Sequence, residues 1–359
     1  MFQKFTDYLF NSNNTKSNTS DEKPKFEYAL KKDEKKQLKS SEEKPKIIAL
    51  YDKSGGTTYC DLTINYLESK GIEVTPVTPE EGLNHPAFNG KFNGIYLPGG
   101  PNIPVDDPSD PRKKFEGQLT ELAHTQDIPL LGICRGEQTI GHHHGHPVKD
   151  IPETTDQHEV HYEYFDTVYR ETQDPTYNSK VVVGKGSQLY NALHHKLNYK
   201  EGSGGIEYNV TCLHHQHVEE HPENSDLQVS GRGKFDSLIE SVEKRTGKYY
   251  TIGLQHHPEA VISSCAETRK EKISRIKSEA EEARFNANFF DPDVAIHTEL
   301  TYSQRVREAH IKSNDEKAAR AELGFFSTQV RQHHLERLVK KEDTENTRDS
   351  YFLSDPWGY

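Results

Sequence analysis

Apolar runs and amphipathic segments alternate along residues 46–133. Four short, mainly apolar runs predict strands; they lie at 46–51, 72–77, 94–97 and 128–133. Residues 58–70 and 115–124 carry the inward-facing apolar spacing of helices. Strands that alternate with helices build βαβ units, so this pattern predicts a parallel sheet whose ligands bind at the carboxyl ends of the strands.

From about residue 154 the alternation gives way to a β-rich pattern. Further strands are expected at 181–183, 210–213, 227–230, 237–242 and 249–254. A short helix is expected to begin within 186–190. Together these elements predict an α/β fold in which helices flank a mostly parallel central sheet.

The two ends of the chain differ in character from its centre. Residues 1–45 are rich in Asn, Ser, Thr, Lys and Glu and have little to bury, which predicts a disordered or loosely helical polar leader. A catalytic domain is expected over 46–265 and a mostly helical C-terminal extension over 266–359. Helical patterns in that extension lie at 267–290, 303–323 and 327–341. The extension could cover the core, mediate homo-oligomerisation or bind a protein partner.

Composition narrows the classes of partner. The net charge of −12 argues weakly against nucleic acid as the main partner. Four cysteines are widely spaced without a C-x-x-C motif, which indicates a reducing compartment. No apolar run approaches the roughly 20 residues that span a bilayer, and residues 2–10 lack the apolar stretch of a signal peptide. We therefore expect a cytoplasmic protein with no membrane partner.

Residues 129–138 contain the first candidate for chemistry. An apolar strand runs into Gly132-Ile133-Cys134-Arg135-Gly136, the G-x-C-x-G form of a nucleophile elbow. The two glycines allow the strand and the following helix to pass closely, and the helix N-terminus favours a thiolate at Cys134. The alternative is that Cys134 is a buried structural cysteine beside a turn.

A second candidate lies where the 249–254 strand ends. His257 is followed by Pro258, which stops the strand, and by Glu259, which can reach the far nitrogen of the imidazole. Thiol, imidazole and carboxylate would then fill the three roles of a catalytic triad. Taken alone, this motif fits a surface His-Pro turn better than a catalytic pair.

Together these motifs resemble the class I glutamine amidotransferase superfamily, and most closely its gamma-glutamyl-gamma-aminobutyrate hydrolase branch, peptidase C26. The motifs follow the order of that family across residues 46–265. They are Leu97-Pro-Gly-Gly100, Ile133-Cys-Arg-Gly-Glu-Gln138, Gly186-Ser-Gln-Leu189, Leu213-His-His-Gln216 and Gly253-Leu-Gln-His-His-Pro-Glu259. The resemblance implies a flavodoxin-like fold and a hydrolase of γ-glutamyl amide bonds that works through a thioester.

The resemblance also implies a role for each matching residue. Cys134 would be the nucleophile, His257 the general base and acid, and Glu259 the residue that orients it. The backbone N–H groups of Gly100 and Arg135 would form the oxyanion hole. Five more residues match positions that bind a small γ-glutamyl substrate, namely Gly99, Gln138, His214, His215 and Gln216. No cofactor is implied.

The chain departs from the family at two places. His142, His143, His144 and His146 replace a small or apolar turn. Imidazole clusters bind zinc or nickel, but neighbours on a helix point about 100° apart, so we expect no metal there. His256 stands where relatives often carry an aromatic or apolar residue, and we expect it to alter the wall of the pocket.

Three functions remain open on the sequence. The first is hydrolysis of γ-glutamyl amides by a self-sufficient enzyme. The second is a glutaminase that supplies ammonia to a separate synthase, since the sequence shows no synthase domain. The third is a binding or regulatory protein on the same scaffold, although the intact Cys-His-Glu set favours catalysis.

Overall fold

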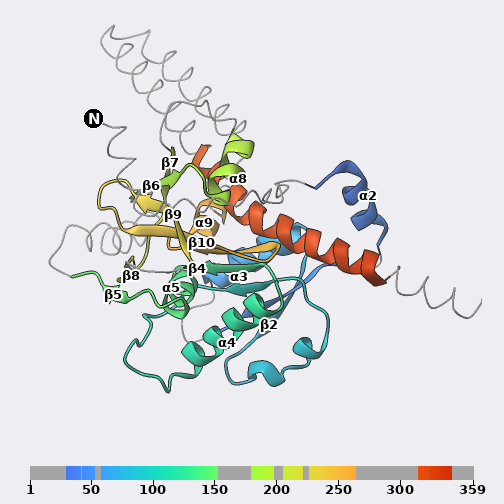
Figure 1. Cartoon of the computed structure of the whole chain (residues 1–359), viewed down its shortest axis with the longest axis horizontal. Coiled ribbons are helices and arrows are strands. Elements are labelled where there is room, and N and C mark those ends of the chain that lie inside the picture. The colour runs from blue at the N-terminus through green and yellow to red at the C-terminus, as the bar shows by residue number, and fades with distance from the viewer. Residues whose placement is uncertain are drawn as a thin grey trace, which may run out of the picture.

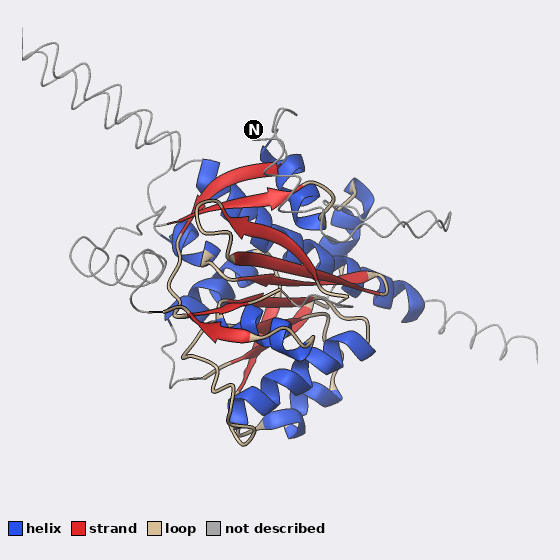
Figure 2. Cartoon of the chain, turned by 60° about the vertical axis from the view of Figure 1, so that its left-hand side comes forward, coloured by secondary structure: helices blue, strands red, loops and turns tan. Residues whose placement is uncertain are grey.

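The computed structural model describes residues 30–41, 43–52, 58–152, 179–197, 205–220, 226–263 and 314–341. A nine-stranded sheet crosses this part of the chain, with helices packed on both of its faces (Figures 1 and 2). Its strand order is β2-β1-β3-β4-β11-β10-β9-β6-β7. The predicted α/β fold is therefore confirmed.

One half of the sheet is parallel, and it joins the four strands expected from the first apolar runs to one later strand. Its strands are β2 (Glu73–Val77), β1 (Lys46–Leu50), β3 (Ile95–Leu97), β4 (Leu130–Ile133) and β11 (Tyr249–Leu254). All neighbouring pairs within this group run parallel. Because β4 and β11 are adjacent, the two candidate motifs, which are more than 100 residues apart in the sequence, follow neighbouring strand ends.

The other half of the sheet is antiparallel. It is formed by β10 (Ile239–Thr246), β9 (Gln228–Gly233), β6 (Ser179–Gly184) and β7 (Gly205–Val210). A small sheet pairs β5 (Val148–Asp150) with β8 (Gln216–Val218). The strand expected at 210–213 is displaced, because β7 ends at Val210 and residues 211–214 leave the sheet as a loop.

Helices form two layers, each packed on its own hydrophobic cluster. One layer contains α3 (Thr58–Ser69), α8 (Gln188–Leu197) and a helix at residues 314–341. The other contains α4 (Pro111–Thr125) and α5 (Arg135–His143). The shorter elements are α2 (Lys32–Ser40), η2 (Gly82–Asn84), η3 (Pro86–Asn89) and α9 (Pro258–Ser263).

Local chemistry explains where several helices begin and end. Gly71 follows α3 with a φ of 78°, the left-handed conformation expected of a helix-ending glycine. Helix α4 begins four residues earlier than predicted, because the Asp110 carboxylate accepts the Lys113 N–H at 2.6 Å and Pro111 opens the first turn. Glu243 of β10 accepts the first N–H groups of α8, including Gln188 N–H at 2.8 Å.

The 314–341 helix is continuous through residues 324–326, where the sequence suggested a break between two helices. It belongs to the core, because Phe325, Phe326 and Val330 are at most 1% exposed. A Cβ atom on Gly94 would lie only 2.7 Å from Val330, so strand and helix meet closely.

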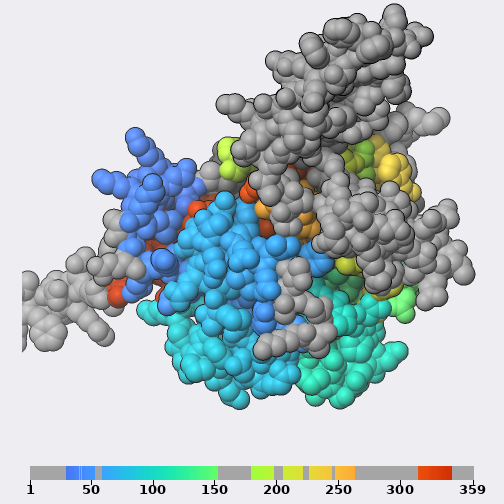
Figure 3. Space-filling view, turned by 180° about the vertical axis from the view of Figure 1, so that it is seen from behind, coloured from blue at the N-terminus to red at the C-terminus, as the bar shows by residue number. Residues whose placement is uncertain are grey.

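The segment before β1 lies beside the far end of the 314–341 helix, where dark-blue and red atoms adjoin in Figure 3. The His334 imidazole contacts the Glu43 carbonyl at 3.1 Å. Part of the expected leader is therefore regular, since it forms helix α2.

The described residues do not include 1–29, 267–290 and 303–313, and the domain boundaries stay predictions. No helix in the described ranges combines the length and apolar character needed to cross a membrane.

Candidate active site

Cys134 occupies a strained turn between β4 and α5. Its φ of 53° and ψ of −108° lie outside the regions that a non-glycine residue ordinarily adopts. A Cβ on Gly132 would lie 2.5 Å from the Gly136 carbonyl, and one on Gly136 would lie 2.2 Å from that of Leu97. Only glycine fits at either position, which confirms the predicted strand–turn–helix geometry, while the role of Cys134 as a nucleophile stays a prediction.

The structure brings Cys134, His257 and Glu259 together. Gly99, at the end of β3, packs against both reactive side chains, because a Cβ there would lie 3.2 Å from His257 Cε1 and 3.4 Å from Cys134 Cβ. The Nδ1 atom of His257 lies 2.7 Å from Oε1 of Glu259. The backbone N–H of His257 donates to the Thr211 carbonyl at 2.8 Å, which fixes the segment that carries the imidazole.

The electrostatic environment of His257 favours the imidazolium. Burial alone would lower the pKa of this residue, but the negative charge of Glu259 and the interactions with Cys134 raise it to about 10. The ring also lies 4.7 Å, centroid to centroid, from that of Tyr59 in α3. A charged imidazole beside the thiol is the arrangement that stabilises a thiolate nucleophile.

Two buried arginines hold the loop after β3 by its carbonyl groups. Arg112 donates from Nη2 to the Gly99 carbonyl at 2.9 Å, and Arg135 donates from Nη1 to the Pro101 carbonyl at 3.0 Å. C=O and N–H point in opposite directions in a trans peptide, so the Gly100 N–H is directed away from Arg112. The Arg135 N–H begins α5 and has no acceptor within the helix.

Glu116 ties these two arginines together. Its Oε1 atom lies 2.8 Å from Arg112 Nε and 3.1 Å from Arg135 Nε, and the carboxylate is fully buried. Sequence reasoning missed Arg112 and Glu116. The available signal was their four-residue spacing on the face of α4 that also carries the buried Phe115 and Leu119.

Three of the residues expected to line the substrate pocket form one buried network. Gln138 donates from Nε2 to the Gln216 carbonyl at 2.8 Å, and His214 Nδ1 contacts the same carbonyl at 2.9 Å. The Gln216 side chain accepts the Ile103 N–H at 2.7 Å. His215 is half-buried, and its carbonyl accepts the Ile151 N–H at 2.7 Å. Contact of these residues with a substrate stays a prediction.

The histidines at the end of α5 contact partners in different segments of the chain. His143 Nε2 lies 3.2 Å from Glu121, and His144 Nδ1 lies 3.0 Å from Asp226. His146 Nδ1 contacts the Glu219 carbonyl at 3.0 Å. These imidazoles therefore tie the end of α5 to three separate segments.

A separate group of three residues has the chemistry of metal ligands. Donor atoms of Cys212, His214 and Glu240 lie within 4.8 Å of one another, and thiolate, imidazole and carboxylate are the ligands that zinc accepts. However, burial and the neighbouring Glu240 raise the pKa of Cys212 well above its usual range. The thiol therefore keeps its proton and donates to Glu240, at 3.7 Å from each carboxylate oxygen. This group differs from Cys134, His257 and Glu259.

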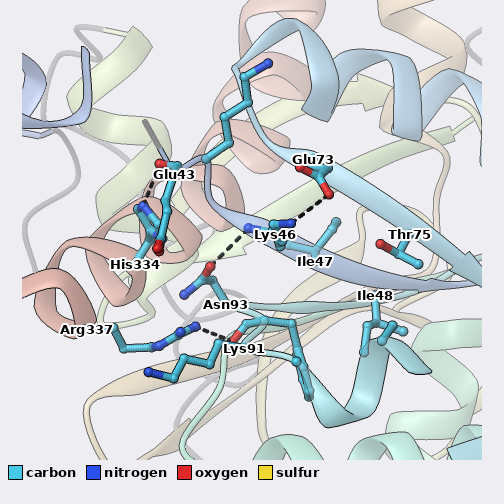
Figure 4. A pocket seen from close by; sticks show the side chains of 14 residues that line it. Glu43, Lys46, Ile47, Ile48, Glu73, Thr75, Lys91, Asn93, His334 and Arg337 are labelled. Carbon is cyan, nitrogen blue, oxygen red and sulfur yellow. Dashed lines mark hydrogen bonds and ion pairs between the residues drawn. The ribbon is translucent and has the colours of Figure 1, made fainter. Parts of the chain in front are cut away.

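A cavity of about 420 Å³ lies at the opposite end of the sheet from Cys134. Figure 4 shows charged side chains around it, including Lys46 paired with Glu73 at 3.1 Å, and Arg337 from the 314–341 helix. Ligands of parallel α/β sheets bind at the carboxyl ends of the strands, and this cavity surrounds the amino ends of β1 and β2. It is therefore separate from the elbow.

Comparison with known proteins agrees with the geometry of the elbow. The profile of the family described as Peptidase C26 matches residues 74–259, which is more than half of the chain. The chain belongs to the peptidase C26 family. Its two candidate motifs both lie within the matched residues, whereas the 314–341 helix lies beyond them.

Individual relatives of this C26 protein are distant. The protein named "Putative glutamine amidotransferase" from Schizosaccharomyces pombe is 26% identical over 199 residues, covering 52% of this chain and 70% of the relative. The gamma-glutamyl-CDP-amidate hydrolase of Campylobacter jejuni is 29% identical over 89 residues, covering 24% and 44% respectively. A glutamine amidotransferase structure from Thermotoga maritima has a TM-score of 0.45 and 15% identity, covering 79% of this chain and 99% of that one. Membership of the C26 family, together with these sequence relatives, identifies the chain as an enzyme of the hydrolase or amidotransferase type.

Proposed function

We propose that this C26 enzyme hydrolyses γ-glutamyl amide bonds through a covalent thioester. The observation that carries the proposal is that Cys134 and His257 both pack against Gly99 and interact with each other, with Glu259 at 2.7 Å from the far nitrogen of His257. The nucleophile thus lies next to the acid–base group, and the acid–base group lies next to the orienting carboxylate, as acyl transfer by a triad requires.

The first half of the reaction forms the thioester. The Cys134 thiolate attacks the γ-carbonyl carbon of the substrate, and the carbonyl oxygen becomes an oxyanion. The N–H groups of Gly100 and Arg135 are the proposed donors to that oxyanion, and losing one donor costs about 3 kcal/mol in comparable sites. The His257 imidazolium then protonates the departing amine as the C–N bond breaks.

The second half releases the glutamyl product. His257, now neutral, takes a proton from water, and the resulting hydroxide attacks the thioester carbonyl. The tetrahedral intermediate collapses with release of the Cys134 thiolate and the γ-carboxylic acid, which loses its proton to solvent, and the imidazole retains the proton it took from water. Glu259 stabilises the imidazolium and keeps its ring in place throughout the cycle.

The proposed substrate is a small molecule with a free glutamyl end. We assign its binding to Gly99, Gln138, His214, His215 and Gln216, which surround the loop over Cys134. The Leu213 carbonyl lies 3.7 Å from Cys134 Sγ, so the 213–216 segment borders the reacting thiol. We further propose a cytoplasmic location, which is supported by the absence of a disulfide at Cys60, Cys134 and Cys212.

The decisive experiment supplies the full chain with γ-glutamyl amines and with glutamine, and measures release of amine and ammonia. Cys134→Ala is the matched inactive variant, because the thiol is removed from a turn that keeps its backbone. Release of amine that depends on Cys134 supports the proposal. Activity on glutamine alone, stimulated by a separate synthase, would replace it with the glutaminase function, and no thioester with any glutamyl compound would rule out both.

A further inference from the structure

A buried ion pair joins the active-site loop to the 314–341 helix. The Nε2 atom of His256 lies 2.9 Å from Oε1 of Glu322, and each side chain is 1% exposed. On its other side, His256 Nδ1 lies 3.7 Å from Oε2 of Glu240 in β10. His256 directly precedes the proposed acid–base residue in the sequence, so this contact reaches the catalytic segment without an intervening side chain.

The surroundings keep His256 positively charged. Burial alone would lower its pKa, but the carboxylates of Glu322 and Glu240 raise it to about 10. Tyr208 of β7 donates its hydroxyl hydrogen to Glu322, because burial and that carboxylate raise the pKa of the phenol well above 10. The imidazolium therefore lies between two carboxylates in a region without solvent, where a single unpaired charge is costly.

One more carboxylate connects this ion pair with the nucleophile. Glu137 of α5 is fully buried, and neither of its oxygens has a hydrogen-bond partner among the described residues. Burial, Glu240 and Cys134 raise its pKa well above the usual range, while the charge of His256 lowers it. The titratable groups that face His256 and its partners thus include Glu137, Tyr208, Cys212, His214, Glu240 and Glu322.

We propose that His256 and Glu322 are positioning residues of the active site, so that the 314–341 helix supports a site whose proposed catalytic residues all lie within residues 74–259. Their ion pair holds the segment that carries His257. The positive charge of His256 also offsets the buried negative charge of Glu240, which lies on its other side. The Gln255 N–H donates to the Glu240 carbonyl at 2.9 Å, which anchors the same segment on its other side. The proposal rests on the proposed catalytic roles of Cys134 and His257.

The test measures the pH dependence of alkylation of Cys134 by iodoacetamide, with mass spectrometry to locate the label. His256→Gln removes a positive charge among carboxylates, so the midpoint of the alkylation rate should move to higher pH by about one unit or more. Glu322→Gln removes a negative charge and should move the midpoint to lower pH. Glu316→Gln, on an exposed turn of the same helix and paired with Arg320, should leave it unchanged.

A merely structural role would lower thermal stability in both variants without moving the midpoints in opposite directions. Equal midpoints in the wild type and both variants, or shifts in the same direction, would overturn the proposal. If His256→Gln does not fold, the double variant H256Q/E322Q restores the charge balance. Its alkylation midpoint should lie close to that of the wild type. A midpoint displaced as far as in either single variant would also overturn the proposal.

Measurements on the same variants distinguish a failure of this proposal from a failure of the proposed function. Alkylation by iodoacetamide requires no γ-glutamyl chemistry. If the midpoints move as stated while no γ-glutamyl compound is hydrolysed, the substrate assignment fails and the ion pair keeps its role. In an active enzyme, Glu322→Gln should lower kcat and leave KM nearly unchanged, because Glu322 acts through His256 rather than on the substrate.

Discussion

The guanidinium of Arg112 donates a hydrogen bond to the carbonyl oxygen of Gly99 at 2.9 Å, although the two residues belong to different elements. This bond sets the orientation of the peptide that ends in the Gly100 N–H. Arg112 thereby links a buried ion-pair network on α4 to the proposed oxyanion hole. The sequence motif contains the glycines, but the direction of their peptide groups depends on this arginine.

Replacing Arg112 by lysine should reduce kcat by about 100-fold, because the ammonium cannot bond Glu116 and the Gly99 carbonyl in the same geometry. Lys114→Ala, on the exposed side of the same helix, is the matched control and should retain the wild-type rate. Steady-state rates with a γ-glutamyl amide, together with thermal melting, distinguish the two variants. Full activity of Arg112→Lys would show that the loop keeps its orientation without this residue.

Two glycine-to-alanine substitutions should behave in opposite ways. Gly99→Ala places a methyl group 3.2 Å from His257 Cε1 and 3.4 Å from Cys134 Cβ, so the two reactive side chains must separate and activity should fall by at least about tenfold. Gly117→Ala lies in α4, where the added Cβ meets no atom within 4 Å. It should be active and more stable by about 0.5–1 kcal/mol. Steady-state rates and denaturant unfolding of the two variants provide the measurement. A fully active Gly99→Ala enzyme would contradict the close packing of Gly99 against Cys134 and His257.

The members of the proposed triad should differ in importance. His257→Ala should lose nearly as much activity as Cys134→Ala, whereas Glu259→Gln should lose about 10- to 100-fold less, because the imidazole is still present. Combining Cys134→Ala with His257→Ala should cost little more than either change alone. The measurement is acylation by an activated γ-glutamyl ester across pH. Additive losses in the double variant would show that thiol and imidazole do not act as a unit.

His256→Ala is not a suitable control for His257→Ala, because His256 has contacts of its own in the interior. The sequence suggested that its side chain alters the pocket wall, but the ring instead contacts Glu322 and Glu240 in the interior. His195→Ala, at an exposed position of α8, is the better control for loss of an imidazole and should leave acylation unchanged.

Acid should destabilise the fold partly through His124. Burial, followed by the charges of His144 and Lys244, lowers the pKa of His124 from 6.5 to about 4. The unfolded chain therefore binds a proton in this range that the folded chain does not, and the free energy of unfolding should decrease as pH falls from about 6.5 to about 4. His124→Gln, which can keep a hydrogen bond to Thr251, should show a smaller decrease than the wild type over that window. Urea unfolding at several pH values provides the test, and identical slopes would contradict it.

Much of the fold and the elbow could be predicted from the sequence, because both depend on local patterns. Short apolar runs located β1, β2, β3 and β4, because strands of a parallel sheet covered on both faces are buried along almost their whole length. The spacing of Gly132, Cys134 and Gly136 indicated the turn, because the strand–helix contact excludes any Cβ at either glycine. The His257–Glu259 pair was accessible for the same reason, as the two residues are separated by one proline.

Only the tertiary structure decided which distant side chains complete the site. Arg112 reaches Gly99, and Glu322 reaches His256, because the sheet order brings α4 and the 314–341 helix against the ends of β3 and β11. Neither pairing has a periodic signature, since a buried charge is stable only next to a partner whose position depends on the packing of the whole domain. Sequence alone thus determined most strands of the parallel half and the candidate reactive groups, and the packing of the helices determined the charges that surround them.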